Sequence, residues 1–353
     1  MSKIIGSNRG KVIIVAAPSG SGRKNHLKRV ADICAKNGKK VKIYQIGPML
    51  FDQAEKQGVH LTHKNVLDRN PDTLNGLRAS ILERILGKLE KELLEYDAVI
   101  ISLHLWFYWR KIFRRAYNYS YLEELHPDIF ITFITSGLKI LQELNSREQW
   151  KDQNLSLENV LGWQNVEVET AAGFAQLYRS KFYAIPTDQP PETFYKLLFH
   201  PEFEPLYPSF PITRLKNKKS QKRILDLISW LDTRFTVINH LHIQTGKIQI
   251  HNKVPSDLAE HYQTVFRDLY WLLGPCLHTV AFFPEIVPSW GVLAEVSEAV
   301  QTTKNTWLIY PGELAGPFER YFTGRIFQNE KEFKNFIDSE HFGGNPPKLI
   351  LRE

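Results

Sequence analysis

A glutamate follows a buried apolar run at a position where parallel β-sheets place reactive groups. Residues 280–283 have the composition of a buried strand, and residues 288–291 predict a loop. A helix is predicted from Leu293 onward, and residues 307–310 are predicted to form the next parallel strand. This order puts Glu295 in the first turn of a helix just beyond a strand, where open α/β sheets bind ligands. A carboxylate at that place can attack or protonate a bound substrate.

A second carboxylate, Asp268, lies upstream of this strand in the sequence. Two carboxylates in one site perform glycosidase-type chemistry, one as nucleophile and the other as acid. Structural interpretations stay open for both residues. Glu295 would interact favourably with the helix macrodipole, and Asp268 would be a solvated helix residue paired with Arg267.

The residues from about Leu206 onward resemble the nucleoside 2-deoxyribosyltransferase family. The family signature contains, in loose order, an Asp, a Gly, a Thr, a Glu and an Ala, and Gly291, Glu295 and Ala299 match three of these residues. The resemblance implies that Glu295 is the nucleophile on the sugar, and that Asp268 positions or protonates the leaving base.

The same resemblance implies which residues surround the substrate. Phe210 and Pro211 would form a loop that stacks on or caps the base, and Ser289 and Gly291 would contact the substrate. Ser289 stands where the family has its Asp, and Val292 where it has its Thr, so the sugar preference is left open.

The N-terminal part contains a strand–loop–helix of the kind that cradles phosphates. A strand is predicted at residues 11–16 and a helix at residues 26–37, closed by Gly38. In the Walker pattern Gly-x-x-x-x-Gly-Lys-Ser/Thr, Arg23 replaces the lysine and Lys24 replaces the hydroxyl residue that holds magnesium. We expect the following residues to bind a nucleotide: Gly20, Ser21, Gly22, Arg23, Lys24 and Asn25.

The segment from about residue 10 to about residue 190 loosely resembles archaeal adenylate kinases and related nucleoside monophosphate kinases. Residues 42–50 match their second strand and the loop to the monophosphate-binding helix, and residues 98–104 match a later strand. Ser102 stands at the place of an acid that organises magnesium in that family. The resemblance implies ATP or another nucleotide as a ligand, with the role of Mg²⁺ left open. An active nucleotide kinase or ATPase, and a non-enzymatic nucleotide sensor or scaffold, are the alternative functions.

The chain of 353 residues predicts two tandem α/β domains, each a mainly parallel sheet flanked by helices. Prolines between Pro186 and Pro205 mark the boundary, with a kinase-like domain at 1–200 and a deoxyribosyltransferase-like domain at 205–353. Two groups of residues are expected to be exposed on helices: Arg147, Trp150, Lys151 and Asp152, and then Trp163, Gln164, Glu167 and Glu169.

The formal net charge is +7, and basic residues crowd the segment before Pro48. This cluster favours a small anion over nucleic acid, because no nucleic-acid-binding motif accompanies it. No apolar run approaches the ~20 residues that span a bilayer, and two cysteines, Cys34 and Cys276, predict neither a disulfide nor a metal site. We therefore expect a cytoplasmic protein without a membrane partner. The aromatic and Arg-rich residues 318–327 are expected at a homo-oligomer interface.

Overall fold

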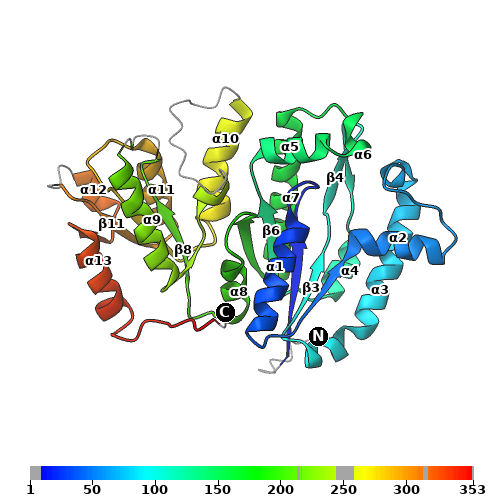
Figure 1. Ribbon diagram of the computed structural model, residues 1–353, viewed down its shortest axis with the longest axis horizontal. Coiled ribbons are helices and arrows are strands. Elements are labelled where there is room, and N and C mark those ends of the chain that lie inside the picture. Colours follow the sequence, from blue (N-terminus) through cyan, green and yellow to red (C-terminus); the bar gives the residue numbers. More distant parts are fainter. Residues whose placement is uncertain (1–8, 213–214, 216, 244–257, 313–316, 352–353) are drawn as a thin grey trace. The chain divides into compact units, whose positions relative to one another are not determined.

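The computed structural model describes residues 9–212, 215, 217–243, 258–312 and 317–351. The chain forms two compact units, Met1–Thr187 and Asp188–Glu353 (Figure 1). The sequence predicts a boundary between residues 200 and 205, whereas the units divide after Thr187. Helix α8 (Pro191–Phe199) lies in the second unit, where Lys196 donates hydrogen bonds to the backbone carbonyls of Asp232 and Phe235.

The first unit is built on a parallel sheet whose strand order is β2-β3-β1-β6-β7. Its central strand carries β-branched residues that are almost all buried, which suits a strand covered on both faces. The chain leaves β1 toward β2 and leaves β3 toward β6, so the connections diverge between β1 and β3. The strands are β1 (Lys11–Ala16), β2 (Val41–Gln45), β3 (Ala98–Ser102), β6 (Ile129–Ile134) and β7 (Lys181–Pro186).

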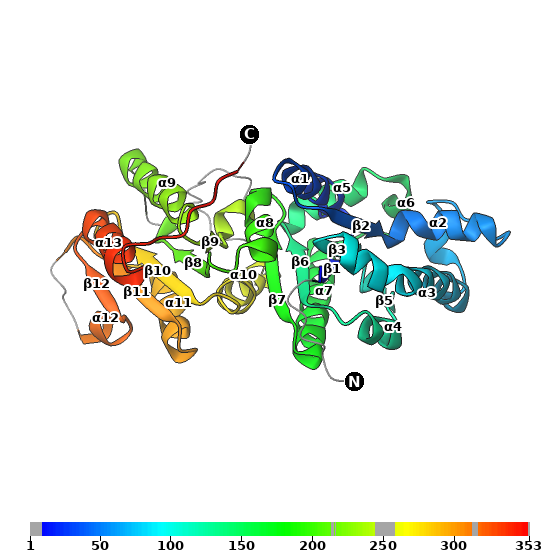
Figure 2. The same cartoon turned by 90° about the horizontal axis from the view of Figure 1, so that it is seen from below.

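Helices cover both faces of this sheet. Helix α1 (Arg23–Lys36) lies on one face, and α3 (Pro71–Glu95) and α7 (Leu157–Tyr178) lie on the other (Figure 2). Apolar side chains of α3 and α7 pack on Val12 and Ile14 of β1 in one core. The remaining helical segments are α2 (Ile46–Lys56), η1 (Val66–Asp68), α4 (Tyr119–Glu124), α5 (Gly137–Asn145) and α6 (Glu148–Lys151).

Two local predictions for this unit are wrong. Residues 46–50 are helical, because α2 begins directly after β2 instead of after a loop. Trp163, Gln164 and Glu167 are buried rather than exposed, since they lie on the face of α7 that contacts the sheet and a hairpin. Trp150 of α6 is buried as well, whereas the other residues of this prediction are exposed. That hairpin, β4 (Trp106–Trp109) and β5 (Ile112–Arg115), has no counterpart in the sequence predictions.

The second unit has a parallel sheet of order β12-β11-β10-β8-β9. When the strands are numbered within the unit and read from β9, this is the doubly wound order 2-1-3-4-5. The direction of the chain connections therefore reverses between β8 and β10. The strands are β8 (Pro205–Ser209), β9 (Thr236–Val237), β10 (His278–Phe282), β11 (Asn305–Ile309) and β12 (Arg325–Phe327).

Helices again cover both faces. Side chains of α9 (Lys218–Asp232) and α13 (Glu330–Phe336) pack with Leu206, Val280 and Trp307 on one face. Helix α11 (Trp290–Gln301) packs on Ala281 and Leu308 of the other face. The remaining helical segments are η3 (His240–Ile243), α10 (Leu258–Phe266), a π-helical turn η4 (Arg267–Leu272), α12 (Pro317–Tyr321) and a π-helical turn η5 (Ile337–His341).

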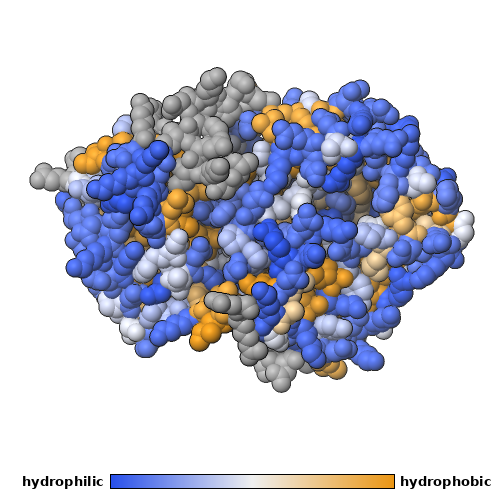
Figure 3. Space-filling view, in the orientation of Figure 1, coloured by the Kyte–Doolittle hydropathy of each residue, from blue (hydrophilic) through white to orange (hydrophobic). Residues whose placement is uncertain are grey.

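The α/β fold class predicted from the sequence, with two parallel sheets flanked by helices, is confirmed. In the described part of the chain, no helix has the length and apolar character needed to cross a membrane. Figure 3 shows hydrophilic residues over most of the visible face of each unit, interrupted by small hydrophobic patches.

Candidate functional site

The carboxyl end of β8 holds the carboxylate of Glu295 in the second unit. Tyr207 and Ser209 alternate along this strand, so both side chains point to the face that α11 covers. The Tyr207 hydroxyl donates to Oε1 of Glu295 at 2.7 Å, and the Ser209 hydroxyl donates to Oε2. Tyr207 and Ser209 are fully buried, so the strand fixes the position of the carboxylate.

Helix α11 begins earlier than the sequence predicts. The Ser289 hydroxyl accepts a hydrogen bond from the Val292 N–H at 3.4 Å and caps the helix at Trp290. Glu295 therefore lies in the second turn of the helix, and its prediction in the first turn is wrong. Gly291 is exposed in the first turn, with an ordinary backbone conformation and open space around its Cα.

Asp268 acts electrostatically on Glu295. Burial and then the negative charge of Asp268 raise the pKa of Glu295 to about 8, while hydrogen bonds from Ser209 and Tyr207 oppose this shift. Arg267 donates to both oxygens of Asp268, at 2.8 and 3.1 Å, from the π-helical turn η4. The negative charge of Asp268, the second predicted catalytic carboxylate, thus disfavours the ionised form of Glu295.

Phe210 and Pro211, predicted to form a loop over the base, are buried in the structure. Phe210 is only 5% exposed and packs in the core on the α9 face, so its ring is not presented in an open loop. The ring of His240 lies 5.6 Å from that of Tyr207 and 6.4 Å from that of Phe210.

His240 was not predicted as a site residue. Burial lowers its pKa to about 4, so the imidazole is neutral at pH 7. Its Nδ1 is buried and has no hydrogen-bond partner among the described residues. Tyr207 and Ser209 were also missed, although polar residues two apart at the end of an apolar strand are a signal that the sequence carries. The pairing of Arg267 with Asp268 agrees with the structural interpretation of Asp268.

In the first unit, two glycines shape the loop between β1 and α1. Gly20 and Gly22 both adopt φ +83°, which only glycine tolerates readily. A side chain at Gly20 would meet the Ile140 backbone oxygen of α5 at 3.2 Å. No side chain caps α1, whose first N–H groups therefore point toward the loop without a side-chain acceptor. The helix starts at Arg23, three residues earlier than the sequence predicts.

Arg23, at the Walker lysine position, is turned toward the protein. Its Nη1 donates to the backbone oxygens of Ala17 and Leu103, and its Nη2 lies 3.2 Å from Nε2 of His104. Burial lowers the pKa of Arg23 to about 10, and the charge of Glu167 opposes this effect. Ser21 is buried, while Lys24 and Asn25 are exposed at the start of the helix.

His104 and Glu167 extend this contact into the unit. Because a guanidinium only donates, Nε2 of His104 accepts and Nδ1 carries the proton. That Nδ1 lies 3.8 Å from Oε1 of the fully buried Glu167. Glu167 accepts hydrogen bonds from the N–H groups of Leu105 and Trp106, at 3.0 and 3.2 Å. The buried carboxylate therefore fixes the segment that follows β3.

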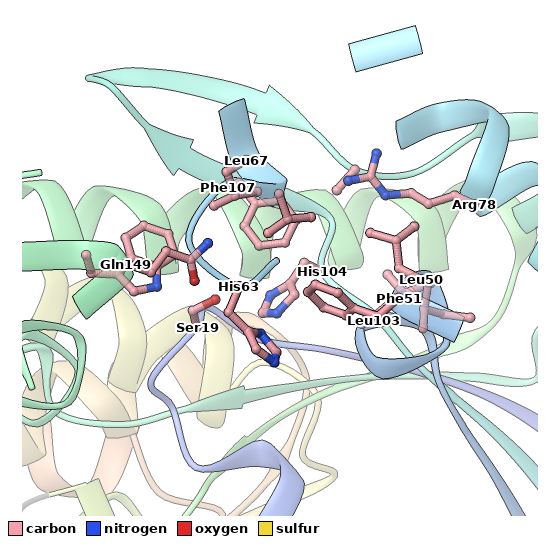
Figure 4. A pocket seen from close by; sticks show the side chains of 15 residues that line it. Ser19, Leu50, Phe51, His63, Leu67, Arg78, Leu103, His104, Phe107 and Gln149 are labelled. Atoms are coloured by element: carbon pink, nitrogen blue, oxygen red, sulfur yellow. The ribbon is translucent and has the colours of Figure 1, made fainter. Parts of the chain in front are cut away.

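A cavity of about 140 Å³ lies beside this loop, at the carboxyl ends of β1 and β3. Figure 4 shows Ser19, His63 and His104 near the middle of its wall, with Gln149 and Arg78 at opposite sides. Burial, and then the like charge of Arg114, lower the pKa of Arg78 to about 10. The Arg78 end of the cavity therefore favours an anionic group.

No family model matches the sequence. Among solved structures, the chain is similar to a sugar kinase from Janibacter sp. HTCC2649 in unliganded form, at 17% identity and a TM-score of 0.29. This match covers 53% of the present chain and 91% of that protein. A shikimate kinase from Bacteroides thetaiotaomicron matches at 13% identity and a TM-score of 0.33, over 62% of the present chain and 98% of the kinase.

Both matches are kinases that act on small molecules. At these identities and TM-scores they assign no activity to the present chain. Neither of them is a deoxyribosyltransferase.

Proposed function

We propose that the second unit cleaves or transfers an N-glycosidic bond of a nucleoside or nucleotide. The observation that carries this proposal is the Glu295 carboxylate, held on both oxygens by Tyr207 and Ser209 at the carboxyl edge of the sheet. The edge lies at the switch between β8 and β10, where doubly wound sheets bind ligands.

Glu295 is the nucleophile in this mechanism. In its ionised form it attacks C1′ or stabilises the oxocarbenium-like centre, and the C1′–N bond breaks with its electron pair going to the base. Both hydroxyl donors favour the ionised form that this step needs. Water or a second base then attacks C1′ and releases Glu295.

Asp268 positions or protonates the leaving base. Because Arg267 donates to both of its oxygens, the carboxylate has a fixed orientation. The neutral His240 lies beside the Tyr207 ring and offers a further polar contact to a substrate.

Mass spectrometry tests this function directly. The protein is incubated with pooled nucleosides, nucleotides and NAD, and the mixture is searched for free base. We expect release of base from at least one class of substrate. Unchanged substrates, together with tight retention of a nucleotide, would instead support a sensor or scaffold.

For the first unit we propose that the loop of residues 17–25 and the adjacent cavity bind a nucleotide. Two features support this proposal: the cationic side chain of Arg78 in the cavity wall, and the uncapped N-terminus of α1, which carries a partial positive charge. A volume of 140 Å³ is smaller than the roughly 300 Å³ of the smallest typical ligand pockets, so the cavity accommodates one part of a ligand.

Kinase or ATPase activity of this unit is the second candidate function. The arrangement at the carboxyl ends of β1 and β3 favours it, whereas Lys24 and Ser102 at the magnesium-organising positions oppose it. Magnesium-dependent ADP formation that disappears in Arg23→Ala would establish it. ADP formation that is equal in wild type and variant would point to a contaminant.

A further inference from the structure

Two histidines and a glutamate converge at the amino-terminal edge of the second sheet. Glu204 directly precedes β8, His278 is the first residue of β10, and His341 ends the turn η5. Their ligand atoms all lie within 4.8 Å of one another. Nε2 of His278 is 2.7 Å from Oε2 of Glu204, and Nε2 of His341 is 3.8 Å from the same oxygen.

We propose that these three side chains form a binding site for a divalent transition-metal ion of the zinc type. Two imidazoles and one carboxylate are a known zinc ligand set, which leaves a fourth position to water. The site contains neither of the two cysteines of the chain. The cysteine pattern, which predicts no metal site, therefore gave no signal for it.

The distances suit such an ion. In tetrahedral zinc sites the ligand atoms lie about 2.0–2.2 Å from the metal, and therefore roughly 3.3–3.5 Å from one another. The two contacts to Glu204, at 2.7 and 3.8 Å, lie on either side of this value. The Glu204 side chain is 41% exposed, so it can adjust by rotation, whereas His278 is 2% exposed.

The surroundings fix the orientation of the two imidazoles. The His278 ring stacks on Trp307, with centroids 5.0 Å apart and planes at 10°. The His341 ring stands nearly perpendicular to that of His278, at 5.1 Å, and contacts Trp307 and Phe235. Rings held in this way lose little rotational freedom when a metal binds.

Asn305 supplies a second layer. Its amide nitrogen Nδ2 lies 3.1 Å from Nδ1 of His278, at the start of the neighbouring strand β11. A half-turn of this amide brings its oxygen to Nδ1–H, and Nε2 then presents its lone pair to the metal. Such a partner on the far ring nitrogen accompanies metal-ligating histidines in general.

The site is separate from the Glu295 site. Glu204 and His278 lie at the amino ends of β8 and β10, whereas Tyr207 and Ser209 lie toward the carboxyl end of β8. Metal at this edge would link the C-terminal turn η5 to two core strands. It would stabilise the folded unit, because an ion that binds only the folded state shifts the unfolding equilibrium.

Zinc binding by the chelator-treated full-length protein tests the proposal. Isothermal titration with ZnCl₂ alone measures affinity and stoichiometry, and Co²⁺ substitution reports four-coordinate geometry by its visible absorption. We expect one zinc per chain, with an affinity at least about tenfold lower in His341→Ala and in Glu204→Gln. Asn305→Ala should lose roughly tenfold while keeping the stoichiometry.

His200→Ala is the matched control, because Nδ1 of His200 lies 2.8 Å from Glu202 in the same unit, and the described residues offer this pair no third ligand. This variant should bind zinc like wild type. Circular dichroism confirms that each variant is folded, and zinc should raise the melting temperature of wild type but not of His341→Ala. Wild-type affinity in both ligand variants, or binding of less than one zinc by wild type, would overturn the proposal.

Discussion

The Tyr207 hydroxyl donates a hydrogen bond of 2.7 Å to Oε1 of Glu295, joining a strand end to a helix 88 residues later in the chain. With Ser209 on the other oxygen, this contact holds the carboxylate at the edge of the sheet. Burial and the charge of Asp268 raise the pKa of Glu295, whereas the two hydroxyl donors lower it. The balance between these effects sets the ionised fraction of Glu295 near neutral pH.

Replacing Glu295 tests the proposed nucleophile. Glu295→Gln keeps the size of the side chain and removes the attacking carboxylate, so base release should fall by at least about 10³-fold. Glu298→Gln changes a partly buried glutamate one turn later on α11 and should keep wild-type activity. Activity of Glu295→Gln at the wild-type rate would remove this residue from the mechanism.

The pH profile of base release should follow the ionisation of Glu295. A nucleophile must be ionised, so kcat/KM should rise with pH and level off above about 8. Tyr207→Phe removes a hydrogen bond that favours the ionised form, so its profile should shift to higher pH. A profile that falls through pH 8 would indicate that protonated Glu295 acts as an acid.

Glu295 should also affect the pH dependence of stability. Its pKa rises from 4.5 to about 8 on folding, so the free energy of unfolding falls as pH rises through this interval. Glu295→Gln lacks this loss of stability. The melting temperature of the variant, relative to that of wild type, should therefore rise as the pH goes from 5 to 8. Differential scanning calorimetry measures the difference, with Glu298→Gln as control. A difference independent of pH would show that the folded pKa is not raised.

Nucleotide binding to the first unit should depend little on magnesium. Lys24 replaces the usual hydroxyl ligand and Ser102 the usual acid, so chelation by EDTA should change the affinity only slightly. Arg23→Ala should weaken binding by about tenfold, or 1.4 kcal/mol, because it removes the guanidinium that joins the loop to β3.

Lys28→Ala removes an exposed positive charge from the same helix and serves as the control in calorimetry. A large loss of wild-type affinity on chelation would mean that magnesium is bound at this loop after all.

A symmetric homo-oligomer, with a two-fold dimer as the smallest unit, remains a prediction. It rests on the aromatic and Arg-rich composition of residues 318–327. Residues 313–316, just before this segment, lie outside the described part of the chain. Light scattering at micromolar concentration measures the mass. A fully active monomer would exclude an active site shared between subunits.

Local pattern was sufficient for much of the fold. The buried β-branched run of residues 11–16 forms β1 over those same residues, and Gly38, with φ +71°, follows the end of α1 as predicted. The strand order around Glu295 also follows from alternating apolar runs and helices, because β10 and β11 pair in parallel. Hydrophobic period and turn residues are short-range signals that need no knowledge of distant partners.

The tertiary structure decided which side chains meet. Glu167 was expected on an exposed helix face, yet it is buried because two backbone N–H groups near β4 require an acceptor. The partners of Glu295 come from a strand 86 and 88 residues away, and Glu204, His278 and His341 gather only when three elements pack together. Such contacts depend on strand order and helix packing over long separations in sequence, which local composition does not encode.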